Sequence, residues 1–209
     1  MGSDYLFGAA ACVLAASIAH KLYRESKLIV PHDSVTVLYS PHRCFVKRVV
    51  RGGESGPEPV TVHVIPKIQE AFTLPYEAIS PTRGLVVDCI VEQVSVHGQL
   101  LDFTLSINYY IDSREFGRYL TMNGPHPPFA SVTKSAAKVV RRVAAGHSPE
   151  VLLDGLKRQH LFDSLFIAEL GPQLIVDACV QLIRVDIKVD LSATHQTGVL
   201  SASDPRSEA

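Results

Sequence analysis

The stretch QLLDFTLSINYYID, residues 99–112, alternates apolar and polar side chains almost without a break. A period of two is typical of a β-strand with one apolar face and one polar face. Such a strand suits an antiparallel sheet that packs on one side only, so a second layer must cover the apolar face. The apolar positions are Leu101, Phe103, Leu105, Ile107, Tyr109 and Ile111, and the polar ones are Asp102, Thr104, Ser106, Asn108 and Asp112.

The residues before this stretch also predict short strands, because they are rich in valine and are separated by segments rich in glycine and proline. The alternation changes phase around Glu92 and Gln93, which predicts a β-bulge. His97 and Gly98 predict a tight two-residue turn into the alternating strand. The predicted strands are residues 35–39, 44–50, 60–65 and 86–96.

The residues after this stretch predict helices and then one more strand. We expect a helix from Ser131 to Ala145 that Gly146 ends, and another that begins at Ser148 and Pro149. Further helical sequence, residues 161–179, contains Pro172, where we expect a kink or a new start. Residues 183–191 alternate again and predict a strand that rejoins the sheet. The predicted fold class is therefore α+β, with helices covering the sheet.

The composition sets broad limits. The chain has 209 residues, of which 46% are apolar, and a formal net charge of -1. This length predicts one main domain with an ordinary core. The balanced charge gives no support to binding of nucleic acid over the whole surface, because such binding usually needs a strongly basic domain.

An uncharged run near the N-terminus predicts a membrane anchor. Residues 5–19 make a helix about 22 Å long, and adding residues 20–23 brings it near the thickness of a bilayer core. Cations after the run favour a body on the cytoplasmic side. A cleaved signal peptide and a buried helix stay open as alternatives. The predicted division is a transmembrane helix with its basic flank, 1–27, a folded domain, 28–191, and a disordered tail, 192–209; the predicted anchor residues are Tyr5, Leu6, Phe7, Val13, Leu14 and Ile18.

The sequence contains no pattern that predicts catalysis. Its histidines lack the spacing of a metal site, its serines lack a nucleophile elbow, and no glycine-rich loop precedes a lysine with serine or threonine. We therefore expect no enzyme activity, no catalytic residue, no cofactor and no metal. Two alternatives stay open: a tethered hydrolase whose site is dispersed in sequence, and a secreted or lumenal ligand-binding domain released by signal cleavage.

One predicted surface favours binding. Lys134, Lys138, Arg141 and Arg142 fall at helical spacing and share one side of the predicted helix of residues 131–145. A basic stripe of this kind can contact anionic lipid or an acidic partner. The alternative is an ordinary solvated helix face.

The order of segments resembles the stomatin, prohibitin and flotillin superfamily, also called SPFH or band 7. Five stretches carry the resemblance, and each is a pattern of apolar positions. They are LIVPHDSVTVLYS (28–40), VHVIPKIQEAFTLPYEAIS (62–80), VHGQLLDFTLSINYYID (96–112), and PEVLLDGL (149–156) followed by ELGPQLIVDACVQLIRVDIK (169–188). The long coiled coil common in the family does not follow residue 191.

The resemblance implies an SPFH-like α+β domain with a scaffolding role. The chain is then expected to be a non-enzymatic, membrane-anchored scaffold, or an accessory subunit that organises a membrane protein complex or the local lipid. Its expected partners are membrane lipid, other subunits of the complex and further copies of the chain. Analogy with prohibitins implies the mitochondrial inner membrane, and analogy with stomatins implies the cytoplasmic face of another membrane.

Overall fold

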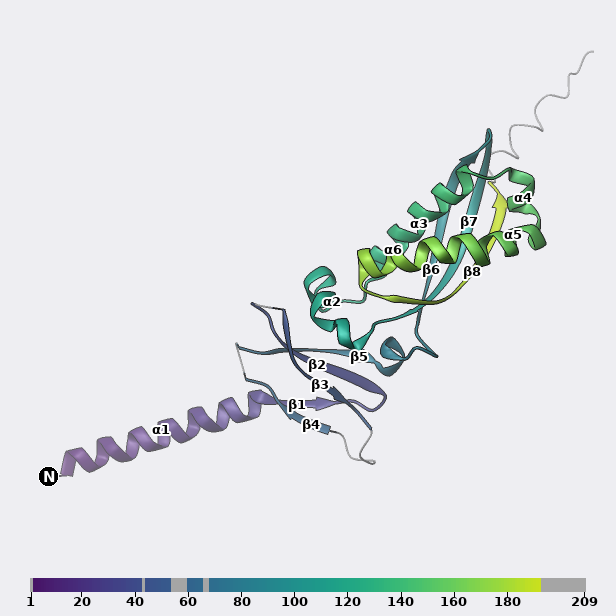
Figure 1. Cartoon of the computed structure of the whole chain (residues 1–209). Helices are drawn as coiled ribbons and strands as arrows, with labels where there is room; N and C mark the ends of the chain where they lie inside the picture. The colour runs from purple at the N-terminus through teal and green to yellow at the C-terminus, as the bar shows by residue number, and fades with distance from the viewer. Residues whose placement is uncertain (1, 43, 54–59, 66–67, 193–209) are drawn as a thin grey trace, which may run out of the picture. The chain divides into compact units, whose positions relative to one another are not determined.

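The computed structural model is an α+β protein (Figure 1). Its sheets and helices agree with the α+β part of the predicted fold class. It describes the backbone of residues 2–42, 44–53, 60–65 and 68–192, and the side chains of these residues except 2–12, 156 and 160–163. The chain divides into two compact units. Unit 1 is residues 1–76 with 116–121, and unit 2 is residues 77–115 with 122–209.

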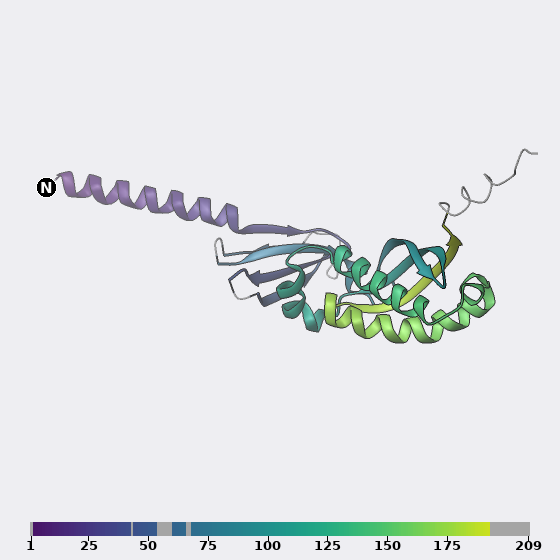
Figure 2. The same ribbon diagram turned by 90° about the horizontal axis from the view of Figure 1, so that it is seen from above.

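Unit 2 is built on a three-stranded antiparallel sheet in the order β6-β7-β8. The central strand β7 is the alternating stretch of the sequence, and its inward side chains from Leu101 to Tyr109 are fully buried. The helices α3 and α6 cover this face, as Figures 1 and 2 show. The bounds are β6 (Leu85–Val96), β7 (Gln99–Tyr110), β8 (Gln181–Leu191), α3 (Phe129–Ala145) and α6 (Ile167–Ala178).

The predicted bulge and turn between β6 and β7 are confirmed. The pairing of β6 with β7 shifts between Val91 and Val94, and Gln93 has a φ of 53°. The backbone N–H of Gln93 donates a hydrogen bond to Asp102 Oδ1 at 2.7 Å, so a carboxylate on the polar face of β7 stabilises the bulge. His97 and Gly98 both have positive φ, 47° and 85°, as the predicted two-residue turn requires.

The predicted new helix start at Pro172 is wrong, and the predicted kink there stays a prediction. Pro172 lies inside α6, which continues past it. Pro172 is exposed, and its fixed φ is compatible with a helix, although it removes one intrahelical hydrogen bond and its ring crowds the carbonyl four residues earlier. The α-helical hydrogen-bond pattern changes before α6, in the π-helical turn η3. The remaining helical elements of unit 2 are η2 (Ser113–Glu115), α4 (Pro149–Leu153), α5 (Gly155–Leu161) and η3 (Phe162–Phe166). Both η1 (Tyr76–Ile79) and α2 (Phe116–Asn123) have residues in each unit.

Unit 1 contains two small antiparallel sheets. In one, β2 lies between β3 and β5, and its side chains are almost all buried. Phe72 of β5 is the centre of an aromatic cluster, with ring centroids 6.0 Å from Tyr39 and 6.3 Å from Phe116 and from Tyr119. The strands are β1 (Lys27–Val30), β2 (Ser34–Ser40), β3 (Phe45–Arg51), β4 (Val60–His63) and β5 (Glu70–Pro75), of which β1 and β5 are additions to the sequence prediction.

The predicted membrane anchor is wrong. Its residues form a helix, α1 (Gly2–Ser26). Among the residues whose side chains are described, however, no helix is long and apolar enough to cross a membrane. The C-terminal part of α1 carries the charged residues Lys21, Arg24 and Glu25, which are costly to place in hydrocarbon. The single-pass membrane localisation predicted from the anchor falls with it.

The six predicted anchor residues fall into two groups. Val13, Leu14 and Ile18 are 67%, 65% and 52% exposed. The side chains of Tyr5, Leu6 and Phe7 lie outside the described residues. The tail predicted to be disordered also lies outside them, apart from Ser192.

The phenol of Tyr109 gives a stability prediction for the core of unit 2. Tyr109 is fully buried, its hydroxyl has no hydrogen-bond partner among the described residues, and burial raises its pKa. An unmade hydrogen bond in the core costs stability. We expect Tyr109→Phe to raise the free energy of unfolding by about 1 kcal/mol in urea denaturation.

Tyr39→Phe is the matched control. The Tyr39 hydroxyl donates to Glu70 Oε2 at 2.8 Å, so its removal is expected to lower the free energy of unfolding by about 1 kcal/mol. Equal losses in the two variants would contradict the assignment of Tyr109 as unpaired.

Candidate partner-binding site on the α3 and α6 helices

The four predicted cations lie together on the exposed side of α3. Lys134, Lys138, Arg141 and Arg142 are all exposed, as their helical spacing predicts. The opposite side of α3 faces the sheet through buried valine and alanine side chains. The fold therefore places these cations on one helix face beside α6.

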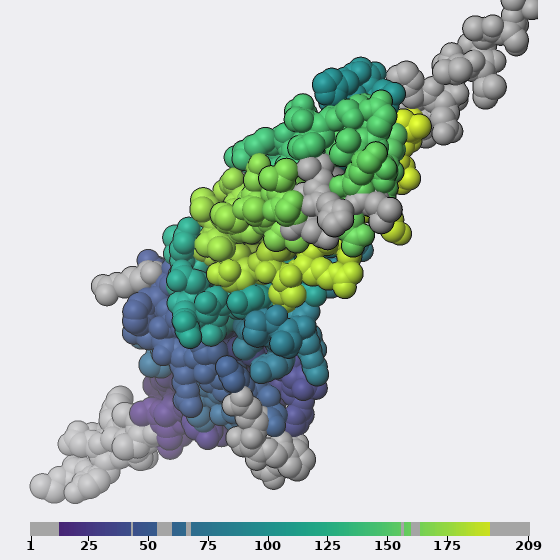
Figure 3. Space-filling model, turned by 45° about the vertical axis from the view of Figure 1, so that its right-hand side comes forward, coloured from purple at the N-terminus to yellow at the C-terminus, as the bar shows by residue number. Residues whose placement is uncertain are grey.

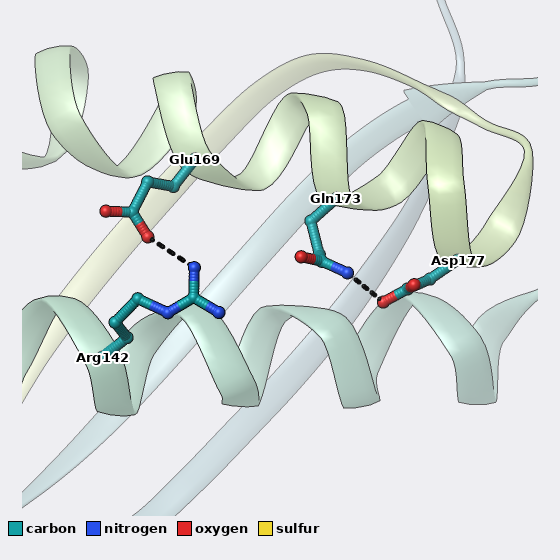
Figure 4. A network of polar contacts seen from close by, with 4 residues as sticks. All are labelled: Arg142, Glu169, Gln173 and Asp177. Carbon is teal, nitrogen blue, oxygen red and sulfur yellow. Dashed lines mark hydrogen bonds and ion pairs between the residues drawn. The ribbon is translucent and has the colours of Figure 1, made fainter.

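Arg142 is partly neutralised by α6. Its guanidinium Nη1 lies 3.3 Å from Glu169 Oε2 (Figure 4). The two side chains are 54% and 38% exposed, so the pair contributes little to stability. Lys134, Lys138 and Arg141 have no carboxylate within ion-pair distance among the described side chains. Among the described side chains, no carboxylate therefore competes with a ligand for these three cations.

Asp177 of α6 is a carboxylate that the sequence analysis missed. Its Oδ2 accepts hydrogen bonds from Gln173 Nε2 at 2.6 Å and from Ser135 Oγ at 2.8 Å (Figure 4 shows the first). These two bonds lower the pKa of Asp177, and the nearby charges of Lys138 and Lys134 lower it further. The carboxylate is therefore an ion at neutral pH.

A pocket of about 420 Å³ lies among these groups. Apolar contact surface comes from Met122 and Val176, which are 43% and 57% exposed. Cations and hydroxyls provide the polar contacts. The lining residues are Met122, Ser131, Lys134, Ser135, Lys138, Val176 and Asp177.

The last residue of α2 is hydrogen-bonded both to the first turn of α3 and to the end of α6. Asn123 Nδ2 donates to the Ala178 carbonyl at 2.9 Å, and Ser131 Oγ donates to Asn123 Oδ1 at 3.3 Å. Cys179, which follows α6, adopts a left-handed φ of 54° and its thiol lies 3.2 Å from Met122 Sδ. The pocket is thus formed by side chains whose backbone positions are constrained.

The groups of this pocket suit binding better than proton transfer. A general acid or base works best with a pKa near the working pH, whereas the pKa of Asp177 is displaced downward. The part of the chain that the structure describes contains no group of three histidine, cysteine or acidic side chains placed to hold a metal ion. The expectation that the chain is no enzyme stays a prediction.

A second concave surface lies in unit 1, between the end of α1 and β4. Its volume is about 780 Å³, and its apolar lining includes Ile18, Leu22 and Ile65. The Tyr23 and His63 rings lie 5.0 Å apart beside it, and Ser26 Oγ lies 3.2 Å from His63 Nδ1. No carboxylate accompanies this serine and histidine within the described hydrogen bonds, so the geometry lacks the third member of a triad.

Comparison with known protein families and with the sequences of curated proteins finds no match for this chain. The resemblance to the stomatin, prohibitin and flotillin superfamily therefore stays a prediction.

Proposed function

We propose that this chain is a non-enzymatic binding module, a scaffold or accessory subunit, that holds an acidic segment of a partner protein against α3. The observation that carries the proposal is the row of three accessible cations, Lys134, Lys138 and Arg141, beside a pocket with apolar surface. Acidic side chains of the partner contact the cations, and one apolar side chain contacts Met122 and Val176. Such charge complementarity contributes specificity and speeds association.

The mixed charge of this surface favours a protein over a membrane. Glu169 and Asp177 stand beside the cations of α3. A lipid surface of uniform negative charge meets these two carboxylates as well as the cations, and a flat bilayer does not fill a pocket. A peptide can place its acids opposite the cations and direct an apolar side chain between the helices.

Fluorescence anisotropy with a short labelled peptide tests the proposal. The probe is a glutamate-rich peptide with leucine at every fourth position, and the comparison peptides replace leucine by serine or glutamate by glutamine. We expect the first peptide to bind most tightly and to weaken as salt screens the charges. The double variant Lys134→Glu/Lys138→Glu is expected to weaken binding at least about tenfold.

Lys27→Glu/Lys47→Glu is the matched control, because it makes the same change of net charge on two exposed lysines of unit 1. Circular dichroism checks that both double variants are folded. Equal weakening by the two variants would show non-specific charge attraction and would contradict the site. Binding to vesicles that contain phosphatidylserine, without binding to any peptide, would replace the protein partner by lipid.

A further inference from the structure

The outer edge of β8 is open to pairing. β8 ends the sheet β6-β7-β8, so one of its edges has no partner strand among the described residues. The edge is long, because β8 spans Gln181–Leu191. Unpaired N–H and C=O groups along such an edge are a template for another strand.

The side chains of β8 alternate regularly between the two faces. Val185 and Val189 are buried toward the helices. The charged side chains between them are exposed on the other face, where Arg184 also contacts Asp186 at 2.7 Å. From Arg184 to Asp190 the sequence reads Arg-Val-Asp-Ile-Lys-Val-Asp, so the charges alternate in sign at every second residue.

We propose that β8 pairs with β8 of a second copy, antiparallel, about a two-fold axis at Ile187. In this register Arg184 faces the partner's Asp190, and Asp186 faces the partner's Lys188. The reciprocal pairs follow from the symmetry, so each charged side chain of residues 184–190 faces an opposite charge. On the helix face, Val185 faces the partner's Val189. Two three-stranded sheets thereby become one continuous sheet.

The charges also select this register over its neighbours. Only every second residue of an edge strand directs its backbone N–H and C=O groups to the free edge. In an antiparallel pair, two opposite residues both direct these groups to each other or both direct them away. The two-fold axis must therefore pass beside a residue and not between two residues. An axis at Asp186 places Asp186 against its own copy and Arg184 against the partner's Lys188. An axis at Lys188 places Lys188 against its own copy and Asp186 against the partner's Asp190. Both arrangements oppose like charges, which is destabilising.

The opposite edge of the sheet does not offer the same complementarity. The charged side chains of β6 are Asp88 and Glu92, which are both acidic. Self-pairing of β6 therefore forms no ion pair, and the bulge near Gln93 interrupts that edge. Acidic charges and a bulge are common means of keeping an edge strand unpaired. β8 instead carries both signs in an order that its own reversed copy complements.

Space is available beside β8. A pocket of about 220 Å³ lies between α5 and the strand, lined by Gly155, Arg158 and Gln159 together with residues 185–188. Gly155 has no atom within 4 Å of the place where a Cβ would lie. Residues of β8, yellow in Figure 3, reach the surface of the molecule. The described side chains of the helix layer therefore leave this part of the edge accessible.

Sedimentation velocity on the full chain tests the dimer, over protein concentrations from about 10 µM to about 1 mM because a short edge contact is expected to be weak. The expected result is a monomer–dimer equilibrium. Asp186→Lys places a second ammonium group against the partner's Lys188 and is expected to weaken dimerisation at least about tenfold, and Lys188→Asp is expected to act likewise. The swapped variant Asp186→Lys/Lys188→Asp restores opposite charges and is expected to dimerise again.

The rescue by the swapped variant separates pairing from misfolding, since all three variants change exposed side chains only. A monomer at every concentration, or growth beyond a dimer, overturns the proposal. A dimer that neither single variant weakens, or single variants that the swap does not rescue, overturns the β8 interface. The result is independent of peptide binding, because Lys134 and Lys138 are unchanged in these variants.

Discussion

Phe103→Ala is expected to lower the free energy of unfolding of unit 2 by about 3–5 kcal/mol, because it leaves a cavity in the middle of the core. Phe103 is fully buried on the central strand β7, where it is paired with Val91 on one side and Val189 on the other. Removing its ring deprives both neighbouring strands and the helix layer of contacts. This loss is comparable with the whole stability of a small domain.

Thr104→Ala is the matched control, because Thr104 is the next residue of β7 and its side chain lies on the exposed face. We expect it to change the free energy of unfolding by less than about 1 kcal/mol. Urea denaturation gives the global values, and hydrogen exchange of the β6 and β8 amides shows whether the loss is local to unit 2. Similar losses at residues 103 and 104 would contradict the assignment of the two faces.

Gly84→Ala is expected to lower the free energy of unfolding by about 2–5 kcal/mol, from backbone strain and overpacking together. Gly84 has a φ of 67°, which non-glycine residues rarely adopt. A Cβ at this position would lie 2.7 Å from the backbone oxygen of Tyr109 and closer still to Asn108 Oδ1. The Asn108 oxygen is itself buried in the sheet, so it has little room to move.

Gly98→Ala separates strain from crowding. Gly98 also has a positive φ, 85°, but nothing lies within 4 Å of the place where its Cβ would be. We expect a loss of about 1 kcal/mol there, from the backbone alone. Thermal unfolding of both variants gives the comparison, and a Gly98 variant as unstable as the Gly84 variant would rule out crowding as the larger cause.

The strands of unit 2 were predictable because their signal is local. The period of two in residues 99–112 and in 183–191 identifies the buried face without knowledge of the partner strand. The strands β1 and β5 were not predicted, since each is short and is defined by a partner distant in the sequence: β1 pairs with β4, and β5 with β2. The predicted membrane anchor depended on the apolar run of residues 5–19 and on the polar and aromatic residues at its ends.

The candidate site could be predicted only in part. Helical spacing was enough to place Lys134, Lys138, Arg141 and Arg142 on one face of α3. The carboxylates opposite them depend on how α6 packs against α3, which no local pattern determines. Ser135 and Asp177, for example, form a hydrogen bond across 42 residues of sequence. The spacing of Gln173 and Asp177 on one helix face was the one local signal available.

The position of β8 in the chain has a consequence for biosynthesis. β6 and β7 are joined by a two-residue turn, but the third strand of their sheet follows only after the whole helical segment. While the ribosome makes residues 111–180, β8 does not yet exist, so the edge of β7 that β8 later covers is unpaired. Contacts between segments so far apart in sequence form slowly. We therefore expect chaperones to bind most to ribosome-bound chains that end before Leu191, because the edge of β7 is not yet paired in these chains.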